Sequence, residues 1–259
     1  MQHFSIRRCA ACQVLPTTVF VRALLAAPSF PGYAFSNESE SMQNTPRLVA
    51  VQVGQPETLD FHGRKWTSAI DKSSVMGRVA LSTKNLMGDR QYNLKYHGGV
   101  DKAVCCYCAV HYPMWRETLG KDDDFKYGAF GENFTVSGML EEEVCIGDVY
   151  AVGTAIVQVS QPRQPCINLA RKWDLRTLPQ QMMDNGRTGY YLRVKQTGEV
   201  GVGDEIKLIE RPCPDLSVLK LNRAMYQQEG GLELFARLAK LPELAASGRR
   251  VFQRMLAAE

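Results

Sequence analysis

The stretch DVYAVGTAIVQVSQ, residues 148–161, contains two runs of mostly β-branched and apolar residues on either side of Val152-Gly153-Thr154. Two such runs joined by a short turn containing glycine predict a β-hairpin. Seven further segments between residues 47 and 210 have the same character. They are RLVAVQV (47–53), TLDFHGRKWTSAI (58–70), RVALST (78–83), KAVCCY (102–107), NFTVSG (133–138), YYLRVKQTG (190–198) and DEIKLIE (204–210). This part of the chain is therefore predicted to form a β-rich, barrel-like domain.

Helical patterns within the β-rich region are few and short. They cover AVHYPMWRETLG (109–120), INLARKW (167–173) and LPQQMMDNG (178–186). The region shows no alternation of strands and helices, no G-x-G-x-x-G after a strand and no Walker A sequence, which disfavours a Rossmann domain and nucleotide-driven chemistry. The predicted fold class is mainly β with peripheral helices.

The character of the sequence changes after Pro212 and Pro214. Apolar residues recur at helical spacing in residues 216–228, 231–241 and 242–259. Ser217 is suited to cap the first helix, and Pro242 to the first turn of the third. We divide the chain into an N-terminal extension (1–44), a β-barrel domain (45–211) and a three-helix domain (212–259), whose apolar faces need the barrel or a partner to cover them.

Composition limits the classes of protein that fit. The 259 residues are 45% hydrophobic and 22% charged, and 31 Lys and Arg against 27 Asp and Glu give a net charge of +4. These values are typical of globular proteins, and no segment is a basic arm, so we expect no stable nucleic-acid binding and no membrane association. Eight cysteines in this length are too few for a disulfide scaffold and favour a reducing, cytoplasmic setting.

The N-terminal segment has some features of a signal peptide, but Arg22, Pro16 and Pro28 interrupt its apolar stretch. We expect residues 1–44 to be a disordered extension, or Met42 to be the true start. The C-x-x-C of Cys9 and Cys12 has no second pair nearby, so incidental cysteines are favoured over a zinc site.

The most unusual motif is VSQPRQPC, residues 159–166, where a strand runs into two prolines and a cysteine that begins a predicted helix. The positive end of that helix and Arg163 both favour the thiolate of Cys166, as in a nucleophile or a soft-metal ligand. A buried structural cysteine after a kinked loop fits this local sequence equally well.

Two other stretches carry candidate ligand contacts. In GDRQYNLKYHGGVDKAVCCY (88–107), the Gly98-Gly99 turn allows close backbone approach, and Arg90, Lys95, His97 and Lys102 are available for an anion, although single lysines are usually solvated. FGENF (130–134) suits either a bulged strand end or a polar ligand contact. With only four histidines and no G-x-S-x-G, a histidine zinc site and a serine hydrolase have no support.

Together the three stretches resemble the MOSC family, the molybdenum-cofactor sulfurase C-terminal domain, and specifically its stand-alone YiiM-type members. The resemblance covers about residues 45–255 and rests on the Gly-Asp…His-Gly-Gly…Asp-Lys-Ala, Gly-Glu-Asn and Gln-Pro-Arg-x-Pro-Cys blocks. It implies a MOSC-type β-barrel followed by a small three-helix domain. It also implies bound molybdopterin, the molybdenum cofactor, with the metal coordinated by Cys166.

The resemblance further implies pocket residues and a reaction. The cofactor-binding candidates are Arg90, Lys102, Asn133, Ser160, Arg163 and Arg187, with Tyr190 beside the last. His97 is the candidate proton donor. Arg187 and Tyr190 fit a helix-to-strand connection at least as well.

The implied activity is the two-electron reduction of small N-hydroxylated compounds such as purine bases, R-NHOH to R-NH2, which would detoxify them. A cofactor carrier, or a sulfur carrier that uses Cys166 without turnover, is the alternative. The sequence has no flavin, nicotinamide, haem or iron–sulfur fingerprint, so we expect a separate electron-donating reductase as partner. A homodimer is left open.

Overall fold

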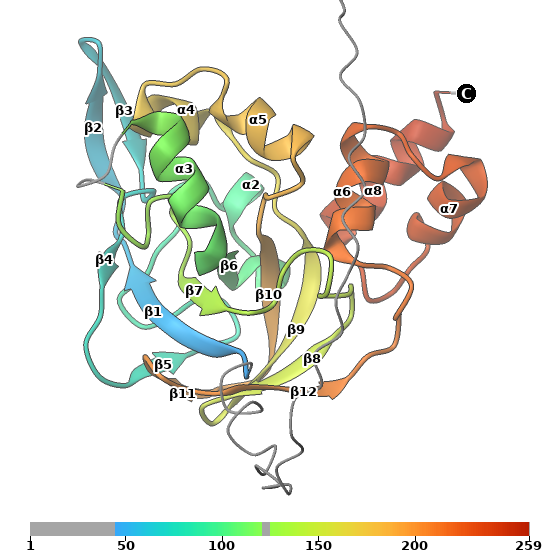
Figure 1. Ribbon diagram of the computed structural model, residues 1–259, viewed down its shortest axis with the longest axis horizontal. Coiled ribbons are helices and arrows are strands. Elements are labelled where there is room, and N and C mark those ends of the chain that lie inside the picture. The colour runs from blue at the N-terminus through green and yellow to red at the C-terminus, as the bar shows by residue number, and fades with distance from the viewer. Residues whose placement is uncertain (1–44, 121–124, 259) are drawn as a thin grey trace, which may run out of the picture. The chain divides into compact units, whose positions relative to one another are not determined.

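The computed structural model of the protein describes residues 45–120 and 125–258. The predictions for residues 1–44, including Met42 and the C-x-x-C pair, lie outside this part of the chain. Eight strands form one sheet in the order β12-β8-β9-β10-β6-β7-β1-β4 (Figure 1). Their bounds are β1 (Arg47–Val53), β4 (Ser73–Ser74), β6 (Val104–Cys108), β7 (Phe134–Ser137), β8 (Val149–Val152), β9 (Ala155–Pro162), β10 (Tyr190–Gln196) and β12 (Ile206–Glu210).

The predicted hairpin at residues 148–161 is confirmed as β8 and β9. Val152 pairs with Ala155 across a turn of Gly153 and Thr154, and the two strands are antiparallel. Strand β9 continues past the end of β8 and pairs with β10 as far as Pro162. The longest strand of the sheet therefore leads directly into the cysteine loop at residues 163–166.

The sheet curls, and backbone hydrogen bonds link its β1 side to the segment before β12. Leu48 N donates to Asp204 O at 2.9 Å, and Gly203 N donates to Leu48 O at 2.8 Å. Side chains such as Val51, Val159 and Leu192 fill the concave interior and are at most 2% exposed. The predicted mainly-β fold is confirmed as a half-barrel sheet.

Two small antiparallel pairs accompany the main sheet. In the first, β2 (Glu57–Phe61) and β3 (Arg64–Ser68) are joined by His62 and Gly63, whose φ angles of 51° and 77° are typical of a tight hairpin turn. The second pairs β5 (Val79–Leu81) with β11 (Gly198–Val200).

Short helices and 3₁₀ turns lie between the strands along the chain. They are α2 (Leu94–His97), α3 (Tyr112–Leu119), α4 (Ile167–Trp173) and α5 (Leu178–Asp184), with single 3₁₀ turns η1 (Val100–Lys102) and η2 (Ala109–His111). Beneath α3, α4 and α5 lies a second core in which half of the buried residues are aromatic, and Tyr107, Trp115 and Phe130 are at most 1% exposed. The three helical segments expected in this region are all found.

Three C-terminal helices follow, α6 (Val218–Tyr226), α7 (Gly231–Leu238) and α8 (Ala246–Leu256) (Figure 1). Ser217 caps α6 as expected, because its Oγ accepts a hydrogen bond from Lys220 N at 3.2 Å. Leu221, Phe235 and Phe252 belong to the same buried cluster as Val159 and Leu192 of the sheet. The three helices therefore share one hydrophobic core with the half-barrel.

The expectation that Pro242 lies in the first turn of the third helix is wrong. Helix α8 begins at Ala246, and Ala245 before it is extended, with φ −53° and ψ 146°. Ala245 N instead donates to Ser160 O at 2.8 Å. Residues 242–244, which were expected to begin the helix, form a turn, and Ala245 attaches the start of α8 to β9. Among the described residues, no helix combines the length and apolar character needed to cross a membrane.

Candidate functional site

A cavity of about 1120 Å³ lies where the ends of several strands meet the loops and α8. This exceeds the range of about 300–1,000 Å³ common for pockets that hold one small ligand, so there is room for a cofactor and a substrate together. Seven of the residues singled out in the sequence line it. They are Arg90, Lys95, His97, Lys102, Asn133, Arg163 and Cys166.

Cys166 occupies the position where the loop after β9 becomes α4. It is the residue before the helix, and its φ of −121° and ψ of 168° are extended. Of the cysteines that the structure describes, Cys166 is the one whose side chain is partly exposed. Cys105 also lines the cavity, but it is buried, and burial raises the pKa of its thiol. Cys166 therefore offers the accessible sulfur of this site.

Arg163 brings a buried positive charge to the same cavity. Its Nη2 donates to Phe130 O at 2.5 Å, and the residue is 6% exposed. Its Nη1 is buried without a hydrogen-bond partner in the described residues. Leaving a charged donor unsatisfied is costly, so this nitrogen is suited to an anionic ligand in the cavity.

His97 and Lys102 lie next to this charge. Lys102 Nζ donates to Tyr96 O at 2.7 Å and lies 5.5 Å from the centroid of the Tyr191 ring. Burial, followed by the charges of Arg163 and Lys102, lowers the pKa of His97 to about 4. The imidazole of this structure is therefore neutral at pH 7.

Asn133 lines the cavity, but both ends of its amide already bind the backbone. Its Oδ1 accepts a hydrogen bond from Cys105 N at 3.1 Å, and its Nδ2 donates to Gln52 O at 3.2 Å. Cys105 belongs to β6 and Gln52 to β1, so Asn133, directly before β7, connects the two strands that flank β7 in the sheet. Asn133 thus fixes the wall of the cavity.

Glu132, beside Asn133, was not singled out from the sequence, although it is fully buried. Its carboxylate accepts hydrogen bonds from Gly128 N at 2.7 Å, Phe130 N at 3.2 Å and Thr135 Oγ1 at 2.9 Å, and another from the Tyr112 hydroxyl. Glu132 therefore shapes the loop whose Phe130 carbonyl holds Arg163.

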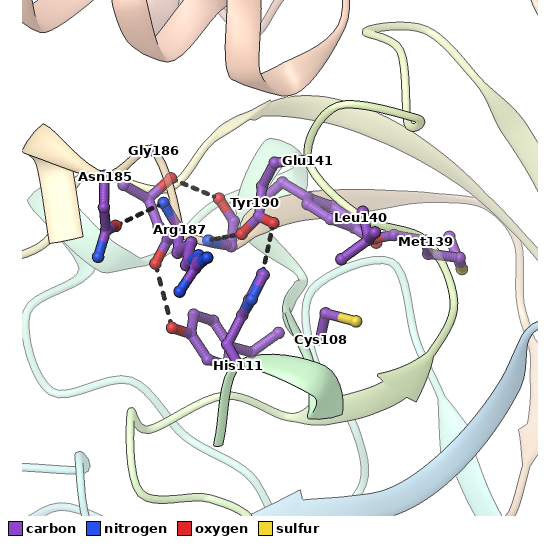
Figure 2. A network of polar contacts seen from close by, with 12 residues as sticks. Cys108, His111, Met139, Leu140, Glu141, Asn185, Gly186, Arg187 and Tyr190 are labelled. Atoms are coloured by element: carbon purple, nitrogen blue, oxygen red, sulfur yellow. Dashed lines mark hydrogen bonds and ion pairs between the residues drawn. The ribbon is translucent and has the colours of Figure 1, made fainter. Parts of the chain in front are cut away.

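Ser160 and Arg187 do not line this cavity. Ser160 is buried, and its Oγ donates to Asp101 O at 2.5 Å. Arg187 lies in a separate network with Asn185 and Met114, near the buried pair of His111 and Glu141, whose nitrogen and oxygen are 2.7 Å apart (Figure 2). Tyr190 also belongs to that region, where its hydroxyl donates to Met139 O at 3.2 Å (Figure 2).

Helix α8 also lines the cavity, which the sequence did not indicate. Ser247, Arg250, Val251 and Arg254 form one side of the cavity. Their spacing of three and four residues places them on one helix face. Periodicity marks Arg250 and Arg254 as an ordinary solvated face, and nothing local indicates that this face turns toward the cysteine loop.

Comparison with known proteins agrees with this architecture. The model of the MOSC domain matches residues 93–207, and that of the YiiM-like, 3-alpha helix domain matches residues 216–259. Protein YiiM of Escherichia coli is 34% identical over 188 residues, which cover 72% of this chain and 84% of that protein. The crystal structure of YiiM from Geobacillus stearothermophilus superposes with a TM-score of 0.68 at 38% identity, over 82% of this chain and 99% of that one.

A fungal relative is longer. A protein of Gibberella moniliformis named Reductase is 38% identical over 182 residues, which cover 70% of this chain and 32% of that protein.

Proposed function

The chain belongs to the MOSC domain family, and from this we propose that it is a molybdenum-cofactor-dependent reductase of N-hydroxylated compounds. The reaction consumes R-NHOH, two electrons and two protons, and it yields R-NH2 and water. The observation that carries the proposal is one cavity that combines the accessible thiol of Cys166 with the buried guanidinium of Arg163, whose Nη1 has no hydrogen-bond partner among the described residues.

The residues of this cavity fit a molybdenum pterin. A thiolate is a suitable ligand for a soft, redox-active metal, and Cys166 would hold the metal through its sulfur. Arg163, Arg90 and Lys102 would neutralise the phosphate of the pterin, for which arginine's forked donors are well suited. Once bound, the cofactor would supply the two-electron chemistry at the hydroxylamine oxygen.

The protein's own contribution is to orient the substrate and to supply protons. His97 lines the cavity, and its neutral imidazole carries one N–H that can donate to the leaving hydroxyl. An anion bound beside Arg163 would offset the charges of Arg163 and Lys102, which lower the pKa of His97 in addition to burial, so it would raise that pKa toward the range useful for proton transfer. Occupancy of the cavity would in this way prepare the proton donor.

The name of the Gibberella moniliformis relative supports a reductase over a carrier. Because the sequence contains no recognisable relay for electrons, we propose that a separate reductase delivers them. Its encounter with this chain would weaken with salt, since surface charges are screened over about 8 Å at physiological ionic strength.

The test uses the purified protein from cells that make the cofactor. We expect it to reduce an N-hydroxylated base with reduced viologen, and to stay inactive with NADH or NADPH until a flavoprotein or haemoprotein donor is added. Direct turnover with NADH would contradict the need for a partner. Bound molybdenum without any turnover would instead identify a carrier.

A further inference from the structure

Helix α8 is held firmly against the strand that leads to Cys166. Three successive residues at its start bind the barrel. Ala245 N donates to Ser160 O at 2.8 Å, Ala246 N donates to Asp101 Oδ2 at 3.3 Å, and Ser247 Oγ donates to Gln161 Oε1 at 2.5 Å. Asp101 is itself fixed by Arg193, whose Nε is 3.0 Å from its Oδ1. The face of α8 that lines the cavity therefore has a fixed position relative to the cysteine loop.

The face of α8 that lines the cavity adds positive charge to a lining in which cationic side chains already outnumber carboxylates. Eight cationic side chains line the cavity, against the single carboxylate of Asp89. They are Lys72, Arg90, Lys95, Lys102, Arg163, Arg171, Arg250 and Arg254. Lys72 is paired with Asp89. One phosphate monoester carries about two negative charges, so the phosphate of a pterin leaves most of these cations unbalanced.

Arg250 and Arg254 of α8 have guanidinium N–H groups that bind no described residue. Arg254 Nε donates to Arg250 O at 3.2 Å, and the guanidinium of Arg250 has no hydrogen bond or ion pair with any described residue. Burial and then the charge of Arg250 lower the pKa of Lys102; Asp101 acts in the opposite direction, but its carboxylate already binds Arg193 and Ala246 N. Like charges held together in this way are typical of an anion site.

Aromatic rings line the same cavity. Tyr92 and Tyr96 are 58% and 59% exposed, and both contribute to its lining. Exposed rings of this kind offer flat surfaces on which a nucleobase can stack. The cavity thus combines stacking surfaces, an anion site on α8 and the thiol of Cys166.

We propose that Arg250 and Arg254 form a subsite for the phosphate of a nucleotide, so that the substrate is an N-hydroxylated nucleoside 5′-monophosphate rather than the free base. This inference rests on the function proposed above. It assigns the C-terminal helices a direct part in substrate recognition, with the base directed toward Cys166 and the phosphate held by α8.

Binding is tested first, by calorimetry on the purified full chain with adenosine 5′-monophosphate, adenosine and inorganic phosphate. We expect the monophosphate to bind more tightly than either of the others. Arg250→Gln and Arg254→Gln should each weaken it about tenfold, the usual effect of losing one charge-assisted hydrogen bond. Lys240→Gln, which removes an exposed cation of the same three-helix segment away from the cavity, should leave it unchanged.

Kinetics gives the second readout. With N6-hydroxyadenosine 5′-monophosphate, both arginine variants should raise KM, while KM for N6-hydroxyadenine should not change. Equal binding of adenosine and its monophosphate would overturn the proposal. Loss of molybdenum or pterin from the arginine variants would also overturn it, because the arginines would then hold the phosphate of the cofactor. Arginine-dependent nucleotide binding without any reduction would refute the reductase and leave the subsite standing.

Discussion

Replacing Glu132 by glutamine tests whether the Gly-Glu-Asn loop is built around a buried carboxylate. Glu132 is fully buried and accepts four hydrogen bonds, three at Oε1 and one at Oε2 from Phe130 N. The glutamine side chain can keep its amide oxygen at the Oε1 position. Its NH2 group then occupies the position of Oε2 and faces the Phe130 N–H. Both groups are donors, so the hydrogen bond from Phe130 N is lost.

The magnitude follows from this count. One hydrogen bond to a charged group is worth about 1.5–3 kcal/mol, and the remaining three weaken because their acceptor loses its charge. We therefore expect Glu132→Gln to lower the free energy of unfolding by about 2–4 kcal/mol. For a domain of this size, that corresponds to a fall in melting temperature of about 5–15 °C.

Urea unfolding followed by circular dichroism measures the difference, with Glu142→Gln as the matched control. Glu142 is exposed, so its variant should stay within about 0.5 kcal/mol of the parent. The loop also holds Arg163 through Phe130 O, so the Glu132→Gln protein should bind anions more weakly. A Glu132→Gln protein as stable as the Glu142→Gln protein would refute the reasoning.

Three further predictions concern the shared core and His97. Phe252→Ala should cost about 3–5 kcal/mol in urea unfolding, because Phe252 is fully buried between the helices and the sheet, whereas Leu232→Ala, at a residue that is 52% exposed, should cost far less. Removal of residues 212–259 should expose this core and cause aggregation, seen by light scattering; a monomeric, folded product would contradict the shared core. In the protein without a bound anion, His97 should titrate at about pH 4 by NMR. The unfolded chain takes up this proton first, so the contribution of His97 to stability should fall as the pH drops from about 6.5 toward 4, and His97→Gln should remove that part of the pH dependence. An ordinary histidine titration near pH 6.5 would show that the cavity does not desolvate the ring.

Most of the fold could be predicted from local sequence patterns. Runs of β-branched residues and glycine turns placed the hairpin at residues 148–161, and helical spacing located all three C-terminal helices. The start of α8 could not be predicted in this way. Pro242 favours a helical first turn locally, but residues 242–244 form a turn and Ala245 N donates to Ser160 O, a partner that lies far earlier in the chain.

The site was predicted in part for the same reason. The motifs at residues 88–107, 130–134 and 159–166 placed seven candidates on the cavity, because these three segments line the same cavity in the structure. Ser160 belongs to the cysteine motif and Arg187 follows α5, but neither lines the cavity. The side chain of Ser160 donates to Asp101 O, and that of Arg187 contacts Met114. Arg250 and Arg254 belong to a helix whose position depends on tertiary packing, which periodicity does not encode.

The central claim is that Cys166 holds a molybdenum cofactor in this cavity. Its most direct test is the molybdenum and pterin content of the purified wild-type and Cys166→Ser proteins, both made in cells that supply the cofactor. The exchange of sulfur for oxygen is nearly isosteric, so the two proteins should have the same melting temperature when both are made without the cofactor. We predict molybdenum in the wild type and its loss, together with loss of reduction, in Cys166→Ser. Equal molybdenum content and equal turnover in the two proteins would contradict the account.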